Sequence, residues 1–156
     1  MIQVVIPGQE TLNLEVLVLD YNGTLALDGQ MLESVKESLI RLSPHLGIHV
    51  ITSDTFGTVV KQCEDLPIHV KVLESSDHIH EKENFLVQFG ERQIVAVGNG
   101  VNDELMLKKA DLGIAVIGFE GASSHTLLAA DIVVHSIEDA LGLLLETTRL
   151  KATLRK

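Results

Sequence analysis

Short apolar runs alternate with longer amphipathic segments along most of the chain. Six runs are rich in branched aliphatic residues and are typical of strands; they span residues 14–19, 48–51, 68–73, 93–97, 112–116 and 131–134. Several are apolar at nearly every position, as expected of parallel strands that helices cover on both faces. Because strand–helix alternation implies right-handed crossovers, the pattern predicts an α/β fold built on a doubly wound parallel sheet.

Segments between and after these strands repeat apolar residues every three or four positions, as helices do. Helices are predicted at residues 32–42, 56–63, 79–89 and 137–150. At the start, residues 2–6 are strand-like and turn-forming Pro7 and Gly8 follow them, which predicts an N-terminal β-hairpin leading into the first core strand. The chain shows no repeat or linker, so residues 1–156 are expected to form a single domain.

The charge balance limits the partners of the chain. It has 12 Lys and Arg residues against 22 Asp and Glu residues, which gives a formal net charge of −10. Nucleic acids and anionic membranes are bound largely by neutralising their negative charge, so neither is expected as a partner. The single cysteine, Cys63, cannot form an intramolecular disulfide, and the N-terminus lacks a signal-peptide pattern. These features predict a cytoplasmic protein.

Polar residues gather where the predicted strands end, which is where doubly wound sheets bind their ligands. The first core strand leads into residues 20–25 (DYNGTL), the second into Thr52 and Ser53, and the fourth into residues 98–103 (GNGVND). Lys82 lies near the start of the helix after the third strand. Carboxylates, amides, hydroxyls and one ammonium group are therefore expected at one edge of the sheet.

This set of groups suits phosphoryl transfer from a small-molecule phosphate substrate. A carboxylate can attack phosphorus and form an acyl phosphate, and Mg²⁺, which prefers oxygen ligands, allows the two anions to approach. Gly23 and Gly100 permit tight turns whose N–H groups face phosphate oxygens. Thr52 or Ser53 would donate a further hydrogen bond, and Lys82 would supply a point charge for the transferring group.

Two of these strings resemble motifs of the haloacid dehalogenase superfamily. Residues 20–25 are similar to its first motif, DxDGT followed by Leu or Val, and residues 98–103 are similar to its fourth, GDGxND. The downstream run KKADLGIAVIG, with AADIVV after it, resembles the phosphorylation domain of P-type ATPases. The closest resemblance is to the soluble P-type-ATPase-like group, free-standing catalytic cores without a membrane part, and it covers essentially the whole chain.

The resemblance implies a role for each residue of the candidate site. Asp20 would be the nucleophile and, together with the backbone carbonyl of Asn22, a ligand of Mg²⁺. Lys82 would bridge the nucleophile and the phosphate. The other roles follow by position in the motifs, with phosphate bound by Thr24, Thr52, Ser53 and Asn102, and the metal bound by Asn99 and Asp103.

Two departures from the family pattern change these implications. Phosphatases of the superfamily usually carry a second Asp two residues after the nucleophile, where it acts as acid and base, whereas Asn22 cannot transfer a proton. Asn99 replaces an anionic metal ligand, so Mg²⁺ should bind more weakly, with Asp103 taking over as the ligand.

The implied function is a Mg²⁺-dependent phosphohydrolase that acts through an aspartyl phosphate on small phosphoesters or a nucleoside triphosphate such as ATP. The alternative, favoured by both substitutions, is a catalytically weak regulatory or phosphate-binding protein of the same fold.

The spacing of the motifs leaves no room for a cap domain. The intervals from Asp20 to Thr52 and from Thr52 to Lys82 are each filled by one predicted helix and one predicted strand. The site is therefore expected to be open unless a second subunit covers it, which favours a homo-oligomer. Lys71 is the alternative to Lys82 as the cation of the site.

Overall fold

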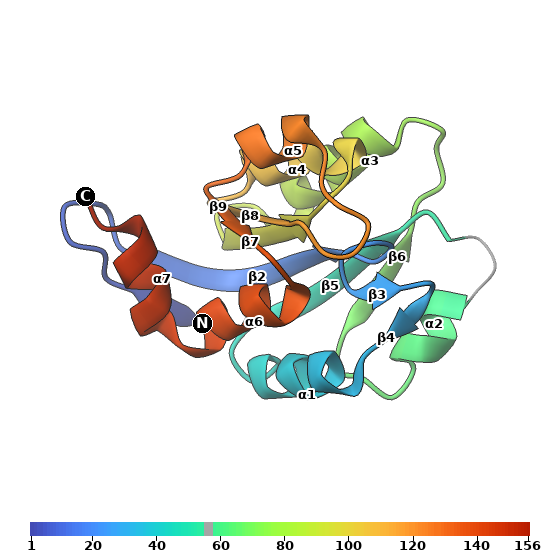
Figure 1. The fold of residues 1–156 in the computed structure, drawn as a ribbon, viewed down its shortest axis with the longest axis horizontal. Helices are drawn as coiled ribbons and strands as arrows, with labels where there is room; N and C mark the ends of the chain where they lie inside the picture. The colour runs from blue at the N-terminus through green and yellow to red at the C-terminus, as the bar shows by residue number, and fades with distance from the viewer. Residues whose placement is uncertain (55–57) are drawn as a thin grey trace.

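The computed structural model describes residues 1–54 and 58–156, and Phe56 of the predicted helix 56–63 lies outside them. The main strands are β2 (Leu12–Asp20), β5 (Gly47–Thr52), β6 (His69–Val72), β7 (Gln93–Gly98), β8 (Leu112–Val116) and β9 (Ile132–Val134). They form one sheet in the order β6-β5-β2-β7-β8-β9, and every neighbouring pair in this series is parallel (Figure 1). The chain builds one half of the sheet outward from β2 and then returns to build the other half. This order confirms the predicted doubly wound α/β fold.

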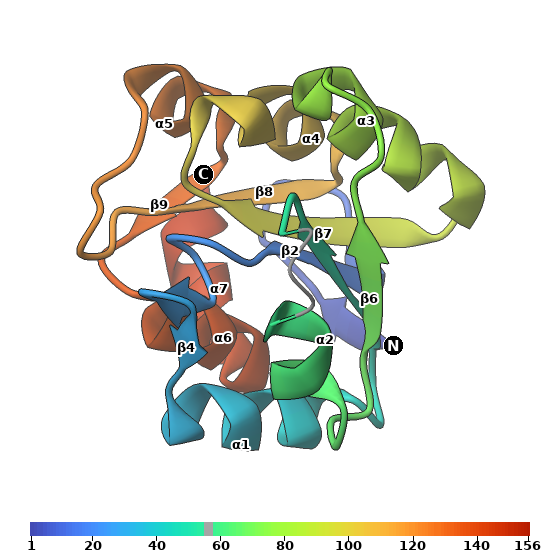
Figure 2. The ribbon, with the colours of Figure 1, turned by 90° about the vertical axis from the view of Figure 1, so that its right-hand side faces the viewer.

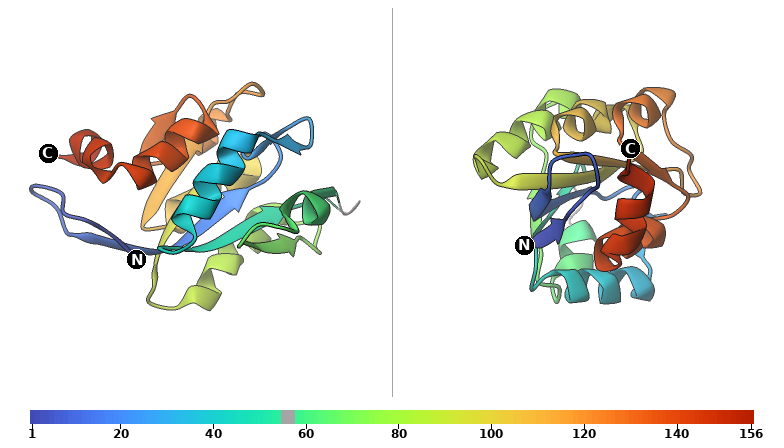
Figure 3. Two further views of the ribbon diagram at one scale, coloured as in Figure 1. Left: turned by 90° about the horizontal axis from the view of Figure 1, so that it is seen from below. Right: turned by 90° about the vertical axis from the view of Figure 1, so that its left-hand side faces the viewer.

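The predicted N-terminal hairpin is also present. Strand β1 (Ile2–Val4) pairs antiparallel with the first residues of β2. Strand β2 is nine residues long, so its later part still pairs with β5 and β7. Figure 3 shows the hairpin projecting beyond the sheet, at the end of the molecule where the chain also finishes.

Helices cover both faces of the sheet (Figures 1 and 2). One face carries α1 (Glu33–Leu42), α2 (Thr58–Cys63), α6 (Ile137–Leu145) and α7 (Thr147–Leu154). The other face carries α3 (His78–Phe85), which continues into the short 3₁₀ helix η1 (Leu86–Phe89), together with α4 (Glu104–Lys109) and α5 (Ser124–Ala129). None of the helices formed by the described residues is long and apolar enough to span a membrane.

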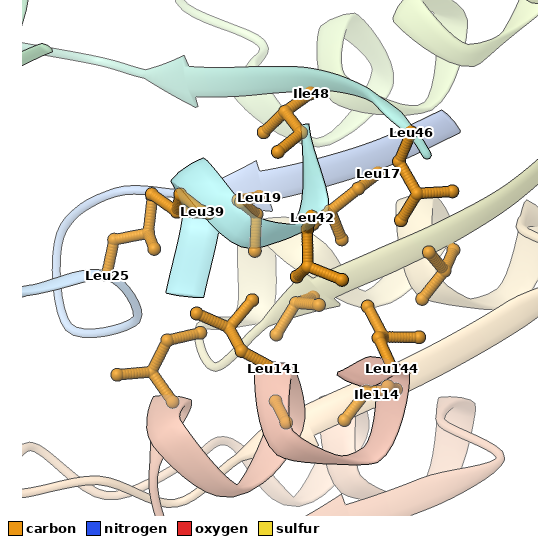
Figure 4. Close-up of a cluster of buried hydrophobic side chains, with 14 of the residues drawn as sticks. Leu17, Leu19, Leu25, Leu39, Leu42, Leu46, Ile48, Ile114, Leu141 and Leu144 are labelled. Carbon is orange, nitrogen blue, oxygen red and sulfur yellow. The ribbon is translucent and has the colours of Figure 1, made fainter. Parts of the chain in front are cut away.

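Burial of β2 on both faces explains its nearly continuous apolar sequence. Successive side chains of a strand point to opposite faces. Leu17 and Leu19 join the apolar cluster beneath α1 and α6, which Figure 4 shows, whereas Val16 and Val18 join the cluster beneath α3 and α4. All four side chains are fully buried. The central strand is thus fixed by two cores, and its end is held in a defined position.

The C-terminal segment differs from the single helix predicted over residues 137–150. It forms two helices, α6 and α7, which meet at Glu146, where the backbone (φ −122°, ψ 73°) is not helical. Leu144 and Leu150 are both buried although they lie on opposite sides of the break. The apolar repeat therefore continues across the interruption, which is why periodicity alone did not reveal it.

A small hairpin that the sequence analysis did not predict follows β2. It consists of β3 (Ala26–Leu27) and β4 (Gln30–Met31), and we call residues 26–31 the flap. Its turn residues Asp28 (φ 51°) and Gly29 (φ 77°) are both left-handed, as two-residue hairpin turns require. The buried hydroxyl of Tyr21 donates a hydrogen bond to the carbonyl of Gly29 at 3.1 Å. Apart from this flap, no inserted cap domain occurs among residues 1–54 and 58–156.

Candidate active site

Lys82 occupies the centre of the site, between Asp20 and Asp103. Its Nζ lies 2.6 Å from Oδ1 of Asp20 and 2.6 Å from Oδ1 of Asp103. Asp20 is the last residue of β2, Lys82 belongs to α3, and Asp103 lies in the 3₁₀ helix η2 (Val101–Asp103) that follows β7. The site therefore forms between β2 and β7, where the order of strands reverses and doubly wound sheets bind ligands.

The three charges are buried, and their pKa values reflect this. Burial raises the pKa of Asp20 to about 7, with a further upward contribution from the charge of Asp103, although Lys82 opposes both. Burial would lower the pKa of Lys82, but the two carboxylates outweigh that effect and the pKa rises. Lys82 is therefore held in its charged form, and Asp20 is the member of the cluster that is costly to ionise.

Asp103 is fixed by the backbone as well as by Lys82. Its Oδ2 accepts hydrogen bonds from the N–H groups of Asn99 and Gly100, both at 2.9 Å. A β-carbon on Gly98 would lie 2.4 Å from Cγ of Asp103. The last position of β7 must therefore lack a side chain for Asp103 to reach its place. With both oxygens engaged, Asp103 holds Lys82 and the loop after β7.

Thr24 and Asn99 lie on the other side of Asp20. Oγ1 of Thr24 is 3.1 Å from Oδ1 of Asn99 and 3.4 Å from Oδ2 of Asp20. Nδ2 of Asn99 donates a hydrogen bond to the carbonyl of Gly121 at 3.1 Å. Oδ2 of Asp20 is consequently the carboxylate oxygen that Lys82 does not hold, and it faces the predicted phosphate-binding hydroxyl of Thr24.

Asn22 and Ser53 lie at the surface next to the strand ends. Both residues line an open cavity of about 440 Å³, whose wall also includes Asp28 and Gly29 of the flap. Both residues are exposed. The structure therefore places the residue two positions after Asp20 at the rim of this cavity.

The other predicted residues lie at the ends of their strands or in the loops that follow. Thr52 is fully buried, and its Oγ1 accepts a hydrogen bond from the N–H of Asp54 at 3.0 Å. Asn102 is half-buried in η2. Lys71, the alternative cation, forms a surface ion pair with Glu74 at 2.9 Å. The structure thus brings Lys82, and not Lys71, to Asp20.

The groups around Asp20 match Mg²⁺ in ligand type but supply little negative charge. Carboxylate, amide and backbone carbonyl oxygens are the donors that Mg²⁺ prefers, and Asp20, Asn99 and the Asn22 backbone offer them. Among the described residues, however, no three His, Cys, Asp or Glu side chains are grouped to hold a metal ion. This finding agrees with the presence of amides at positions 22 and 99.

One segment beside the site was missed by the sequence analysis. The loop of residues 117–123 after β8 contacts Asn99 twice, through the carbonyl of Gly121 and through the N–H of Ser123, which donates to the Asn99 carbonyl at 2.9 Å. The loop also carries Glu120. Its two left-handed glycines, Gly118 and Gly121, were the only local signal that the chain turns back toward the site.

No family model matches the chain, but individual proteins are similar to it. It is 66% identical over 64 residues to the uncharacterized protein MJ0073 of Methanocaldococcus jannaschii, a match covering 41% of this chain and 69% of that protein. The 3-deoxy-D-manno-octulosonate 8-phosphate phosphatase of Moraxella catarrhalis, solved with magnesium, phosphate and KDO, matches with a TM-score of 0.72 at 16% identity. That match covers 92% of this chain and 94% of the phosphatase.

A segment of an ATPase has a similar fold. A zinc-transporting PIB-type ATPase matches with a TM-score of 0.59 at 19% identity, over 79% of this chain and 20% of the ATPase. The phosphatase match has the higher TM-score and covers most of both proteins. The assignment to the P-type-ATPase-like group therefore stays a prediction. The chain belongs to the same family as MJ0073, and it has the fold of haloacid dehalogenase (HAD) superfamily hydrolases.

Proposed function

We propose that this protein is a Mg²⁺-dependent phosphohydrolase that acts through an aspartyl phosphate on Asp20. The observation that carries the proposal is the buried cluster in which Lys82 lies 2.6 Å from both Asp20 and Asp103, at the strand-order reversal. The phosphatase from Moraxella catarrhalis, which has the same fold, was solved with magnesium and phosphate, and this supports the proposal. The substrates would be small phosphoesters or a nucleoside triphosphate such as ATP.

The reaction would proceed in two displacements at phosphorus. Oδ2 of Asp20 attacks the phosphorus atom, the bond from phosphorus to the leaving oxygen breaks, and that oxygen takes a proton from water. Water then attacks the aspartyl phosphate, which releases inorganic phosphate and restores the carboxylate. Lys82 offsets the negative charge that accumulates beside Asp20 in both steps. Asn22 can hydrogen-bond in these steps, but it can neither give nor take the proton.

Ligand binding is assigned to the residues around this cluster. Asp20 and the carbonyl of Asn22 would hold Mg²⁺, with Asn99 and Asp103 beside it, and the ion would neutralise charge between the carboxylate and the phosphate. The phosphate would be held by Thr24, Thr52, Ser53 and Asn102. Because the cavity beside Asn22 and Ser53 is open to solvent in the part of the chain that the structure describes, we also propose that a second copy of the chain covers it. Light scattering at working concentration tests that assembly, which a monomer would contradict.

A second candidate function is a phosphate-binding or regulatory protein with weak catalysis. The observation that favours it is the exposed amide of Asn22 at the rim, where a phosphatase would need a proton donor. Such a protein would bind phosphate with little turnover.

Phosphate release from nitrophenyl phosphate, a sugar phosphate and ATP, with and without Mg²⁺, separates the two candidates. Asp20→Asn should abolish Mg²⁺-dependent release, because it removes the nucleophile. Asp139→Asn, a matched change at an exposed carboxylate in the first turn of α6, should leave release unchanged. Wild-type activity in Asp20→Asn would refute the mechanism, whereas phosphate binding without turnover would favour the second candidate.

A further inference from the structure

The loop after β8 holds a carboxylate over the site. Gly118 (φ 58°) and Gly121 (φ 78°) flank Glu120, and both adopt left-handed conformations that turn the chain sharply. Backbone hydrogen bonds anchor both ends of the loop. The N–H of Gly118 donates to the segment after β9 at 2.9 Å, and the N–H of Ser123 donates to the carbonyl of Asn99 at 2.9 Å. The position of Glu120 is therefore set by the loop.

Glu120 and Asn99 converge on Gly23, next to the proposed metal ligand. A β-carbon on Gly23 would lie 2.5 Å from Oε2 of Glu120 and 2.7 Å from Nδ2 of Asn99. Gly23 directly follows Asn22, so the carboxylate of Glu120 lies beside the turn that carries the backbone carbonyl assigned to the cation. In residues 1–54 and 58–156, nothing forms a hydrogen bond or ion pair with Glu120, whose side chain is exposed.

The charge of the site explains why a further carboxylate matters there. Asp20 and Asp103 share the single ammonium of Lys82, so the buried cluster carries one net negative charge when both carboxylates are ionised. Proteins usually bind Mg²⁺ through one or two carboxylates together with substrate phosphates. Asn99, which lies between Thr24 and the loop, is neutral. Glu120 adds a carboxylate beside Gly23, in the loop that follows Asp20.

Asn99 also holds the loop that carries this charge. Its Nδ2 donates to the carbonyl of Gly121, the residue after Glu120, at 3.1 Å. A carboxylate at position 99 could not donate this hydrogen bond. The amide therefore supplies, in place of a charge, a contact that holds the backbone next to Glu120.

We propose that Glu120 is the carboxylate that completes the divalent-cation site, in place of the charge that Asn99 lacks. This inference rests on the proposed function, because it takes the cation to lie beside Asp20. It adds a ligand from a loop that carries no recognised motif.

Calorimetric titration of the protein with MgCl₂ tests this assignment through metal affinity, without any substrate. Four proteins are compared: wild type, Glu120→Gln, Glu138→Gln and Asp20→Asn. Glu138 lies across the same apolar cavity of about 430 Å³ that Glu120 lines, so it is a matched control for charge near the site. Glu120→Gln should weaken Mg²⁺ affinity by roughly tenfold or more, as loss of a metal-site carboxylate typically does. Glu138→Gln should change it by less than about twofold, because the exchange leaves every proposed ligand in place.

Thermal unfolding gives a second readout. Without Mg²⁺, Glu120→Gln should melt at the wild-type temperature, because the exposed side chain makes no internal bond. With Mg²⁺, it should show a smaller rise in Tm than wild type, because the rise depends on affinity.

The outcomes separate this inference from the proposed function. If Asp20→Asn loses Mg²⁺ binding while Glu120→Gln binds as wild type does, the role of Glu120 is refuted and the proposed function stands. If Glu120→Gln and Glu138→Gln weaken Mg²⁺ affinity equally, the effect comes from surface charge in general, and the role of Glu120 is also refuted. A wild-type protein that binds no Mg²⁺ would overturn both.

Discussion

The ammonium group of Lys82 lies 2.6 Å from a carboxylate oxygen of Asp103, and neither side chain is more than 1% exposed. Removing one member of a buried charge pair leaves the other without compensation in a poorly solvated place. Here one ammonium compensates two carboxylates, so Lys82 contributes to stability as well as to the proposed chemistry.

Replacing Lys82 by Met should strongly destabilise the fold. Asp20 and Asp103 would remain buried together, and the free energy of unfolding at pH 7 should fall by about 3–5 kcal/mol. Urea denaturation measures this change. Lys71→Met is the control, because its ion pair with Glu74 is at the surface, and it should cost no more than about 1 kcal/mol. Equal losses in the two variants would contradict the role given to Lys82.

Gly98→Ala should disturb the site from within β7. The new β-carbon would lie 2.4 Å from Cγ of Asp103, so the buried carboxylate would have to move, at a cost of about 1–3 kcal/mol. Gly47→Ala, at the start of β5, is a matched control, because the nearest atom to its β-carbon would be 3.8 Å away. The midpoint of urea denaturation should drop for the first variant and change little for the second. If both behave alike, the close approach to Asp103 does not constrain residue 98.

Asn22→Asp should raise turnover most for substrates with poor leaving groups. A positioned acid–base group is worth typically 10²–10⁴-fold, and it matters most when the leaving oxygen needs a proton. We therefore expect a larger gain on a sugar phosphate than on nitrophenyl phosphate, measured as kcat/KM for each. Asn84→Asp, at an exposed position of α3, provides a control for an added charge. An equal or smaller gain on the sugar phosphate would mean that the missing acid does not limit the reaction.

His49 should make the stability depend on pH. Burial lowers the pKa of His49 from 6.5 to about 4, and the neighbouring His69 and Arg92 make smaller contributions in the same direction. Between these values the unfolded chain binds a proton that the folded chain does not, so this contribution is complete above pH 6.5 and is lost as the pH falls toward 4. The His49 ring stacks on His69 at 4.9 Å between centroids and meets the edge of Phe89 at 4.8 Å, which accounts for its burial.

Urea denaturation at pH 7 and pH 5 checks this expectation. His49→Gln should lose less stability between the two pH values than wild type does, whatever its absolute stability. His135→Gln, at an exposed histidine, should keep the wild-type difference. An unchanged pH dependence in His49→Gln would show that another group is responsible.

The sequence predicted the sheet and most of the site because both follow from local patterns. Parallel strands deliver their carboxyl ends to one edge, so Asp20 and the residues after β7 were expected to meet, and Lys82 was placed there by its spacing. The flap was not predicted because its strands have two residues each, which is too few for an alternating pattern, although Asp28-Gly29 is a turn signal. Glu120 was not identified as a site residue because its position depends on how a loop folds back on Gly23, and no local sequence pattern predicts that contact.

The flap has a consequence for how the site is protected from water. Tyr21, the neighbour of Asp20, is buried and contacts the flap at two points. Its hydroxyl donates a hydrogen bond to the carbonyl of Gly29, and its backbone carbonyl accepts one from the N–H of Ala26. The flap is therefore attached to the residue that follows the proposed nucleophile, and a ligand that orders Tyr21 is expected to slow amide exchange in residues 26–31. Hydrogen exchange of this short hairpin should therefore report occupancy of the site even where no side chain of the hairpin touches the ligand.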